Sequence, residues 1–215
     1  MGRTLKWQDD YWLLLMQVYL RRPTGLKPVY CREMVELGLE LHVHPKTLAD
    51  KMEQISSLET PRIERIWNTY HNNPRKLSRA VRLFREMNGF GRADMFYDGV
   101  EMNETWERDW QPLAEDNRLT LVMLTLVLDL FFRLTPATMV AQTPEVQELA
   151  RLMKLPTDLV VDLLDIYQHC DPYLNRRDVI ISGMTGPCQE IWKRYGNGDT
   201  ESLARLAEQL KAFFM

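Results

Sequence analysis

The segment 32–61, REMVELGLELHVHPKTLADKMEQISSLETP, predicts the architecture because a second stretch repeats its pattern. Residues 144–172, PEVQELARLMKLPTDLVVDLLDIYQHCDP, follow at a displacement of 112 residues, which shrinks to 111 after the turn. The matched pairs include Glu33 and Glu145, Leu37 and Leu149, Pro45 and Pro156, Ile55 and Ile166, and Pro61 and Pro172. We therefore expect a duplicated helical unit.

The repeated pattern continues on both sides of these segments. Tyr19-Leu20-Arg21 corresponds to Phe131-Phe132-Arg133, and Trp67 corresponds to Trp192 after a displacement of 125 residues. Two copies of one fold rarely keep the same active site, so residues that recur in both copies are better explained by packing. We interpret the recurring Arg and Trp residues as determinants of the fold.

Apolar residues recur at helical spacing throughout both copies. The predicted helices of the first copy cover residues 11–21, 31–41, 45–56 and 62–70, and a fifth helix starts after residue 74. In the second copy they cover 119–134, 144–153, 156–168, a segment around Trp192, and 200–214. The sequence therefore predicts an all-α fold of two tandem degenerate repeats, each of about five helices with a helix-turn-helix-like core.

Three regions follow from this pattern. Residues 1–90 form the first repeat, 91–116 an aromatic connector that we expect to pack across both repeats, and 117–215 the second repeat with an insertion at 173–187. Up to Asp98 the chain has 16 Lys and Arg against 12 Asp and Glu, whereas from Gly99 onward it has 11 against 18. The first repeat is therefore basic and the second acidic, and a polyanion would bind the first.

Residues 119–134, LTLVMLTLVLDLFFRL, are the most apolar stretch of the chain. The stretch is shorter than the roughly 20 residues that a bilayer requires, and Asp129 and Arg133 can pair within it at i,i+4 spacing. We expect a buried core helix and no membrane partner. The three cysteines form no CxxC pair and no signal peptide is recognised, which favours reduced thiols in the cytoplasm.

No residue pattern indicates catalysis, a cofactor or a metal. His42 and His44 form an HxH pair at a helix end, without the Cys and His cluster that a zinc site needs. Cys31 has no evident His base, and Gly-Phe-Gly at 89–91 lacks the full glycine fingerprint of a phosphate-binding loop. We therefore predict a non-enzymatic protein with no cofactor and no bound metal.

The helix-turn-helix pattern gives the strongest functional hint. Leu37, Gly38, Leu41, Val43 and Leu48 occupy positions where this motif has small or apolar residues, and the second repeat also fits. The second helix of the first motif has Lys46, Thr47 and Lys51, whereas its equivalent has Asp158, Asp162 and Asp165. Arginines of the segment 62–92 add further positive charge. The predicted DNA-binding residues are Lys46, Thr47, Lys51, Arg75, Lys76, Arg79 and Arg82.

Residues 7–61 also resemble a known helical segment. They are similar to the segment that precedes the nuclease domain in some bacterial HNH endonuclease-like proteins. The residues that carry this similarity are Tyr19-Leu20-Arg21, Glu36-Leu37, Pro45, Leu48, Lys51-Met52 and Thr60-Pro61. In the second repeat, Cys170-Asp171-Pro172 is similar to the Asp-Pro that closes that segment. The resemblance implies a DNA-associated helical module. The HNH motif itself is absent from the sequence, so no catalytic residue is carried over.

Two functions stay open. In the first, the protein binds double-stranded DNA through the basic repeat, while the acidic repeat packs or forms a homodimer. In the second, it is a helical interaction or scaffold protein whose partner is another protein, and its arginines form a solvated face that pairs with the acidic repeat. Salt separates the two functions, because binding to phosphates releases counterions and therefore weakens steeply as salt rises.

Overall fold

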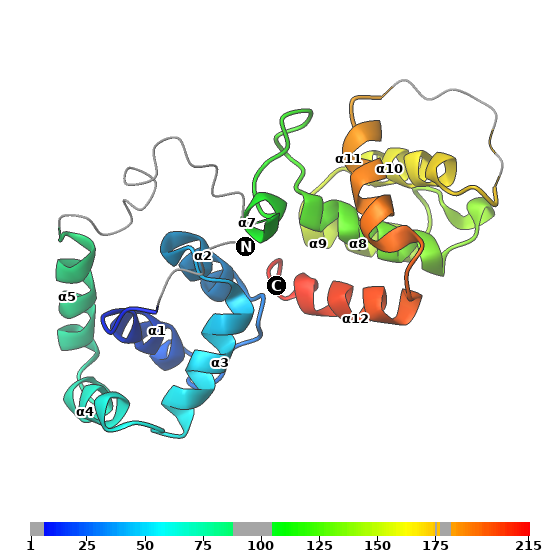
Figure 1. Cartoon of the computed structure of the whole chain (residues 1–215). Helices are drawn as coiled ribbons and strands as arrows, with labels where there is room; N and C mark the ends of the chain where they lie inside the picture. Colours follow the sequence, from blue (N-terminus) through cyan, green and yellow to red (C-terminus); the bar gives the residue numbers. More distant parts are fainter. Residues whose placement is uncertain (1–6, 88–104, 175, 177–181) are drawn as a thin grey trace. The chain divides into compact units, whose positions relative to one another are not determined.

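The computed structural model describes residues 7–87, 105–174, 176 and 182–215. Every regular element in these residues is helical, which confirms the all-α prediction. The chain forms two compact units that divide between Glu104 and Thr105 (Figure 1). The described residues do not include 88–104, which contain most of the predicted connector. They also do not include 175 and 177–181, which belong to the predicted insertion.

The first unit contains α1 (Tyr11–Leu20), α2 (Arg32–Leu41), α3 (Pro45–Ser56), α4 (Pro61–Tyr70) and α5 (Pro74–Arg85). α1 is the central helix, because it packs against each of the other four. Its Leu14, Leu15 and Met16 are almost completely buried, as expected of a helix that is apolar on most sides. Figure 1 shows α3 and α5 on opposite sides of α1.

Proline and a preceding polar residue begin three of these helices. Pro45, Pro61 and Pro74 each occupy the first turn, where proline has a suitable φ and lacks an N–H that would have no helical partner. The preceding side chain accepts a free backbone N–H in each case: Thr60 Oγ1 from Ile63 at 3.3 Å, Asn73 Oδ1 from Lys76 at 3.0 Å, and His44 Nδ1 from Lys46 at 3.1 Å.

A three-residue turn, 42–44, joins α2 to α3, and the two helices pack against each other. His42 has a left-handed backbone with φ of 54°. This conformation lets the N–H of Val43 donate to the carbonyl of Gly38 at 2.9 Å, and the Val43 side chain is buried beside the helix end. The turn ends α2 and sets the direction in which α3 leaves it.

The second unit contains α7 (Thr105–Asp109), α8 (Leu121–Arg133), α9 (Pro144–Met153), α10 (Thr157–Cys170), α11 (Thr185–Ile191) and α12 (Thr200–Lys211). A 3-10 turn, η1 (Pro136–Thr138), follows α8, and a π-helical turn, η2 (Trp192–Gly196), follows α11. α8 is the central helix of this unit and packs against the other five α-helices. α7 lies within the predicted connector, 91–116, and α11 begins within the predicted insertion, 173–187.

α8 is the apolar helix that the sequence predicted to be a buried core helix. Its residues from Leu121 to Phe131 are all buried except Met123, and Asp129 is only 5% exposed. Arg133 Nη2 lies 3.0 Å from Asp129 Oδ2, so the predicted i,i+4 pair is confirmed. Among the helices of the described residues, none has both the length and the apolarity needed to cross a membrane.

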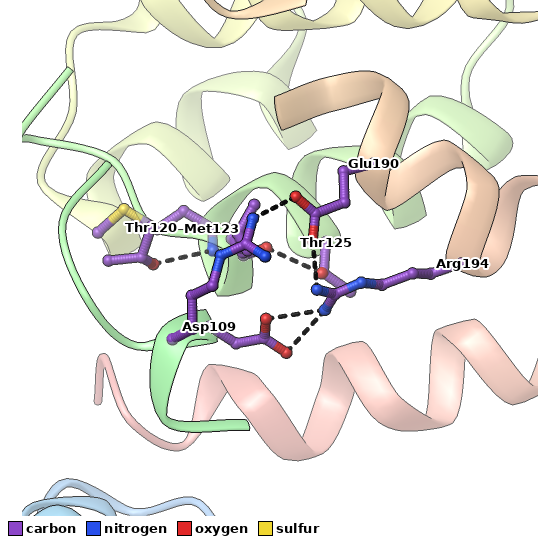
Figure 2. Close-up of polar contacts among 8 residues, drawn as sticks. Asp109, Thr120, Met123, Thr125, Glu190 and Arg194 are labelled. Carbon is purple, nitrogen blue, oxygen red and sulfur yellow. Dashed lines mark hydrogen bonds and ion pairs between the residues drawn. The ribbon is translucent and has the colours of Figure 1, made fainter. Parts of the chain in front are cut away.

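A cluster of four charged residues holds α7 on the second unit. Arg194 lies between two carboxylates: its Nη1 donates to both oxygens of Asp109, at 2.8 and 2.9 Å, and its Nη2 donates to Glu190 (Figure 2). Arg108 pairs with the other oxygen of Glu190. Burial raises the pKa of Asp109, although the hydrogen bond from Arg194 opposes that change. These contacts explain why α7 belongs to a folded unit rather than to a linker.

Candidate nucleic-acid interface

The outward side of α5 is a row of arginines. Leu77 and Val81 point into the first unit and are buried, whereas Arg75, Arg79 and Arg82 are exposed. Their spacing of i, i+4 and i+7 places them on one side of the helix over about 10 Å. Together with Pro74 and Ser78 they line a shallow, open depression of the surface. We call Arg75, Arg79 and Arg82 the α5 arginine row.

The α5 arginine row has few counter-charges. Arg82 Nε lies 3.7 Å from Glu86 Oε1, and both side chains are well exposed, so this pair is weak. Within the described residues, neither Arg75 nor Arg79 has an ion-pair partner. Arg85 is different, because its Nε and Nη2 donate to both oxygens of Glu40 at 2.6 and 2.7 Å and so fix α5 to α2. The row is therefore open to an external anion.

Lys76 lies beside the row rather than in it. Its ammonium group is 5.4 Å from the centre of the Tyr70 ring, a cation–π contact that joins the start of α5 to the end of α4. Lys76 is exposed, so the contact leaves it accessible to solvent. Ser78 was not predicted as a site residue. It lies three residues after Arg75 and four before Arg82, and this helical spacing is the signal that could have placed it in the depression.

The predicted residues of α3 have a different environment. Lys46 and Thr47 are exposed in the first turn, but Asp50 and Glu53 follow Lys46 at i+4 and i+7 on the same outward side and are also exposed. This row contains two carboxylates and one ammonium group, a poor match for phosphates. Lys51 is half-buried, with its ammonium 5.5 Å from the Trp12 ring centre and 5.7 Å from the Trp7 ring centre.

The seven predicted residues thus fall on two surfaces. α1 lies between α3 and α5, so the central helix separates the two sets of residues (Figure 1). The structure brings Arg75, Arg79 and Arg82 together with Lys76 close by, and leaves Lys46 and Thr47 apart from them. The α5 arginine row is the stronger of the two candidates because, among the described residues, its one ion pair is the weak contact of Arg82 with Glu86.

Comparison with known proteins adds no family to this picture. No family model, curated protein or solved structure matches the chain. The resemblance to the helical segment of HNH endonuclease-like proteins stays a prediction, and the candidate interface has to be judged on its own chemistry.

Two cysteines and two histidines of the described residues lie in the core or at helix ends. Burial raises the pKa of the Cys188 thiol to about 12, and burial also raises the pKa of Cys31. His42 forms the end of α2, and His44 caps α3. Within the part of the chain that the structure describes, no three His, Cys, Asp or Glu side chains are grouped to hold a metal ion.

Proposed function

We propose that the first unit binds double-stranded DNA through the phosphate backbone, using Arg75, Arg79 and Arg82, without catalysing a reaction. The observation that supports this proposal is the α5 arginine row, in which exposed guanidinium groups with little counter-charge share one side of a helix. A guanidinium group is planar and donates two parallel hydrogen bonds to a phosphate, so arginine suits this contact better than lysine does.

The proposal assigns α5, not α3, to the duplex. A helix that reads bases in the major groove needs donors and acceptors on its outward side, where contacts with phosphates also form. The outward row of α3 contains Asp50 and Glu53, which would repel phosphates on either side of the groove. Contacts from α5 to phosphates would hold the duplex without reading its sequence. We therefore expect DNA binding with little sequence preference.

A salt titration tests this function directly. We would measure the fluorescence anisotropy of a labelled random duplex with the full chain and with Arg75→Glu/Arg79→Glu/Arg82→Glu. If three to four phosphates are neutralised, the affinity should fall about 40- to 150-fold between about 50 and 200 mM salt. The triple variant should lose this binding. Absence of binding by the native chain at low salt would contradict the proposal.

A control has to show that the α5 variant loses DNA binding because of the positions it changes and not because of its net charge alone. Arg151, Lys154 and Arg205 are exposed cations of the second unit. The variant Arg151→Glu/Lys154→Glu/Arg205→Glu changes the net charge by the same amount as the α5 variant, so it is a matched control and should keep nearly the native affinity. A third variant, Lys46→Ala/Thr47→Ala, separates the two surfaces. We expect it to change the affinity less than about twofold, whereas a loss as large as that of the α5 variant would return α3 to the interface.

We also propose that the two units are degenerate copies of one helical unit, with a binding surface developed on the first. Two geometric features support this relation. His42 and Lys154, 112 residues apart, end α2 and α9 with nearly the same left-handed φ, 54° and 57°. The rings of Tyr19 and Trp67 meet edge-to-face at 5.9 Å and 76°, and those of Phe131 and Trp192 do so at 5.7 Å and 75°.

Burial revises the register of the proposed duplication. Leu48, Met52 and Ile55 are the buried residues that follow the turn in α3, and residues 112 positions later, Val160, Leu164 and Tyr167, are fully buried in α10. Both turns contain three residues, 42–44 and 154–156. A constant displacement of 112 therefore fits better than the shortening to 111 that the match of Pro45 with Pro156 suggested.

Exchange of the two turns tests the duplication and its register. If residues 42–44 and 154–156 are equivalent, a chain with these triplets exchanged should lose less than about 1.5 kcal/mol of stability, which is within the usual range for tolerated substitutions. The control exchanges 43–45 with 154–156, the register displaced by one, and should be clearly less stable in urea unfolding. Equal stability of the two chimeras would contradict the register of 112.

A further inference from the structure

An acidic row on α10 has the charge and spacing to bind the α5 arginine row. Asp158 and Asp162 are exposed, and the side chain of Asp165 is 42% exposed. The opposite side of α10 is buried through Val160, Leu163, Leu164 and Tyr167. Asp165 pairs with Arg176 at 2.6 Å, whereas within the described residues Asp158 and Asp162 have no ion-pair partner. Two of the three carboxylates therefore lack a counter-charge.

We propose that the α5 arginine row of one copy of this chain binds the α10 acidic row of a second copy, so that the protein self-associates through opposite charges. This inference uses the same arginines as the proposed DNA interface but does not rest on DNA binding. It requires only that the two rows are accessible on separate molecules, which their exposure provides.

The two rows are opposite in charge and equal in spacing. Arg75, Arg79 and Arg82 are separated by four and then three residues, and Asp158, Asp162 and Asp165 are separated in the same way. With a rise of about 1.5 Å per residue, both rows are about 10 Å long. When the two helices lie side by side, the three guanidinium groups can therefore align with the three carboxylates, of which Asp158 and Asp162 lack a counter-charge and Asp165 already pairs with Arg176. Carboxylates accept the same bidentate hydrogen bonds from arginine that phosphates accept.

Other acidic rows of the described residues match less well. Asp50 and Glu53 on α3 share their row with Lys46, and Glu145 and Glu148 on α9 are followed at i+3 by the exposed Arg151. A cation within the row would repel the arginines of α5. The α10 row has no cation on the helix itself. Arg176 pairs with Asp165 and leaves Asp158 and Asp162 without an ion-pair partner among the described residues, and this is why we assign the row as the occupant.

Sedimentation velocity of the full chain, without nucleic acid, tests the inference. We expect association that increases with protein concentration at low salt and disappears at about 300 mM salt, where charges more than a few ångströms apart are screened. A native chain that stays monomeric at low salt at every concentration would overturn the proposal. Because no DNA is present, this result does not depend on whether the protein binds DNA.

Reversing the charges of the two rows in separate variants tests whether α5 and α10 form the contact between copies. Arg75→Glu/Arg79→Glu/Arg82→Glu places Glu on α5 opposite Asp on α10, and Asp158→Arg/Asp162→Arg places Arg on α10 opposite Arg on α5. Each variant alone should be monomeric, while an equimolar mixture should associate, because both contacts between unlike copies then join opposite charges. A mixture that stays monomeric, with both variants folded by circular dichroism, would overturn the assignment of the rows.

A matched control keeps the same change in net charge. Glu145→Arg/Glu148→Arg reverses two exposed carboxylates of α9 in place of those of α10. This variant should associate with itself at low salt as the native chain does. If it becomes monomeric, net charge rather than the α10 row controls association, and the proposal fails.

Discussion

At the scale of single residues, the left-handed backbone at Lys154 has a cost that glycine would remove. Its φ is 57°, a region in which a Cβ atom crowds the following carbonyl oxygen. Lys154→Gly should therefore raise the free energy of unfolding by about 0.5–1 kcal/mol. Lys154→Ala is the control, since it removes the charge but keeps the Cβ atom. Urea unfolding measures both variants, and an equal gain in the alanine variant would show that charge, not conformation, is responsible.

Cys188 gives a second prediction at this scale. Its side chain is fully buried, and burial raises the pKa of its thiol to about 12, so very little thiolate is present at pH 8. A thiol reagent reacts with the thiolate, and we expect Cys188 to stay unmodified in the folded protein and to react once urea unfolds it. Mass spectrometry of the labelled peptides checks this. Rapid labelling of Cys188 before unfolding would show that the second unit opens readily.

Lys51 shows what the sequence could and could not reveal about the candidate site. The composition identified a basic first half, and helical spacing grouped Arg75, Arg79 and Arg82 before the structure placed them side by side. The charge of Lys51 predicts a DNA contact, although this residue lies three residues after Leu48 and four before Ile55, on the apolar side of α3. Its contact with Trp7 and Trp12 depends on residues 39 or more positions away, which local spacing does not reveal.

At the scale of elements, the most accurate predictions were those with a physical boundary in the sequence. Pro45 and Pro144 mark the first turns of α3 and α9, and both helices have the predicted limits. α7 was missed because its five residues are held by ion pairs to Glu190 and Arg194, more than 80 positions later. The sequence predicts a helix around Trp192 but does not indicate that its residues 192–196 form a π-helical turn.

The packing of η2 makes Gly196 a sensitive position. A Cβ atom there would lie 2.5–2.8 Å from the ring of Trp192, which is itself enclosed by Phe131, Phe132 and Tyr167. We expect Gly196→Ala to lower the free energy of unfolding by about 1–3 kcal/mol, the usual cost of overpacking. Gly186→Ala is the control, because no atom lies within 4 Å of its Cβ position. Thermal unfolding of both variants checks this, and equal effects would contradict the packing argument.

At the scale of the whole molecule, the two proposed partners of α5 exclude each other. Duplex DNA and the α10 acidic row of a second copy would use the same three guanidinium groups. If both proposals hold, a short duplex added at low salt should disperse the self-associated protein. Sedimentation velocity with an absorbing label on the duplex would show protein and DNA moving together at the size of a one-to-one complex. Larger complexes that retain protein association would show that the two partners bind different surfaces.

The way α5 is attached has a further consequence for how binding could be observed. Leu77 and Val81 of this helix are buried and Phe84 is half-buried against the core, while Arg85 pairs with Glu40 and Lys76 contacts the Tyr70 ring. α5 has fewer buried side chains than α1, so its amide hydrogens should exchange with deuterated water sooner than those of α1, whose side chains fill the core. An anion that bridges Arg75, Arg79 and Arg82 would hold successive turns of α5 together. Slower deuterium uptake confined to this helix would therefore report occupancy of the site, whichever ligand occupies it.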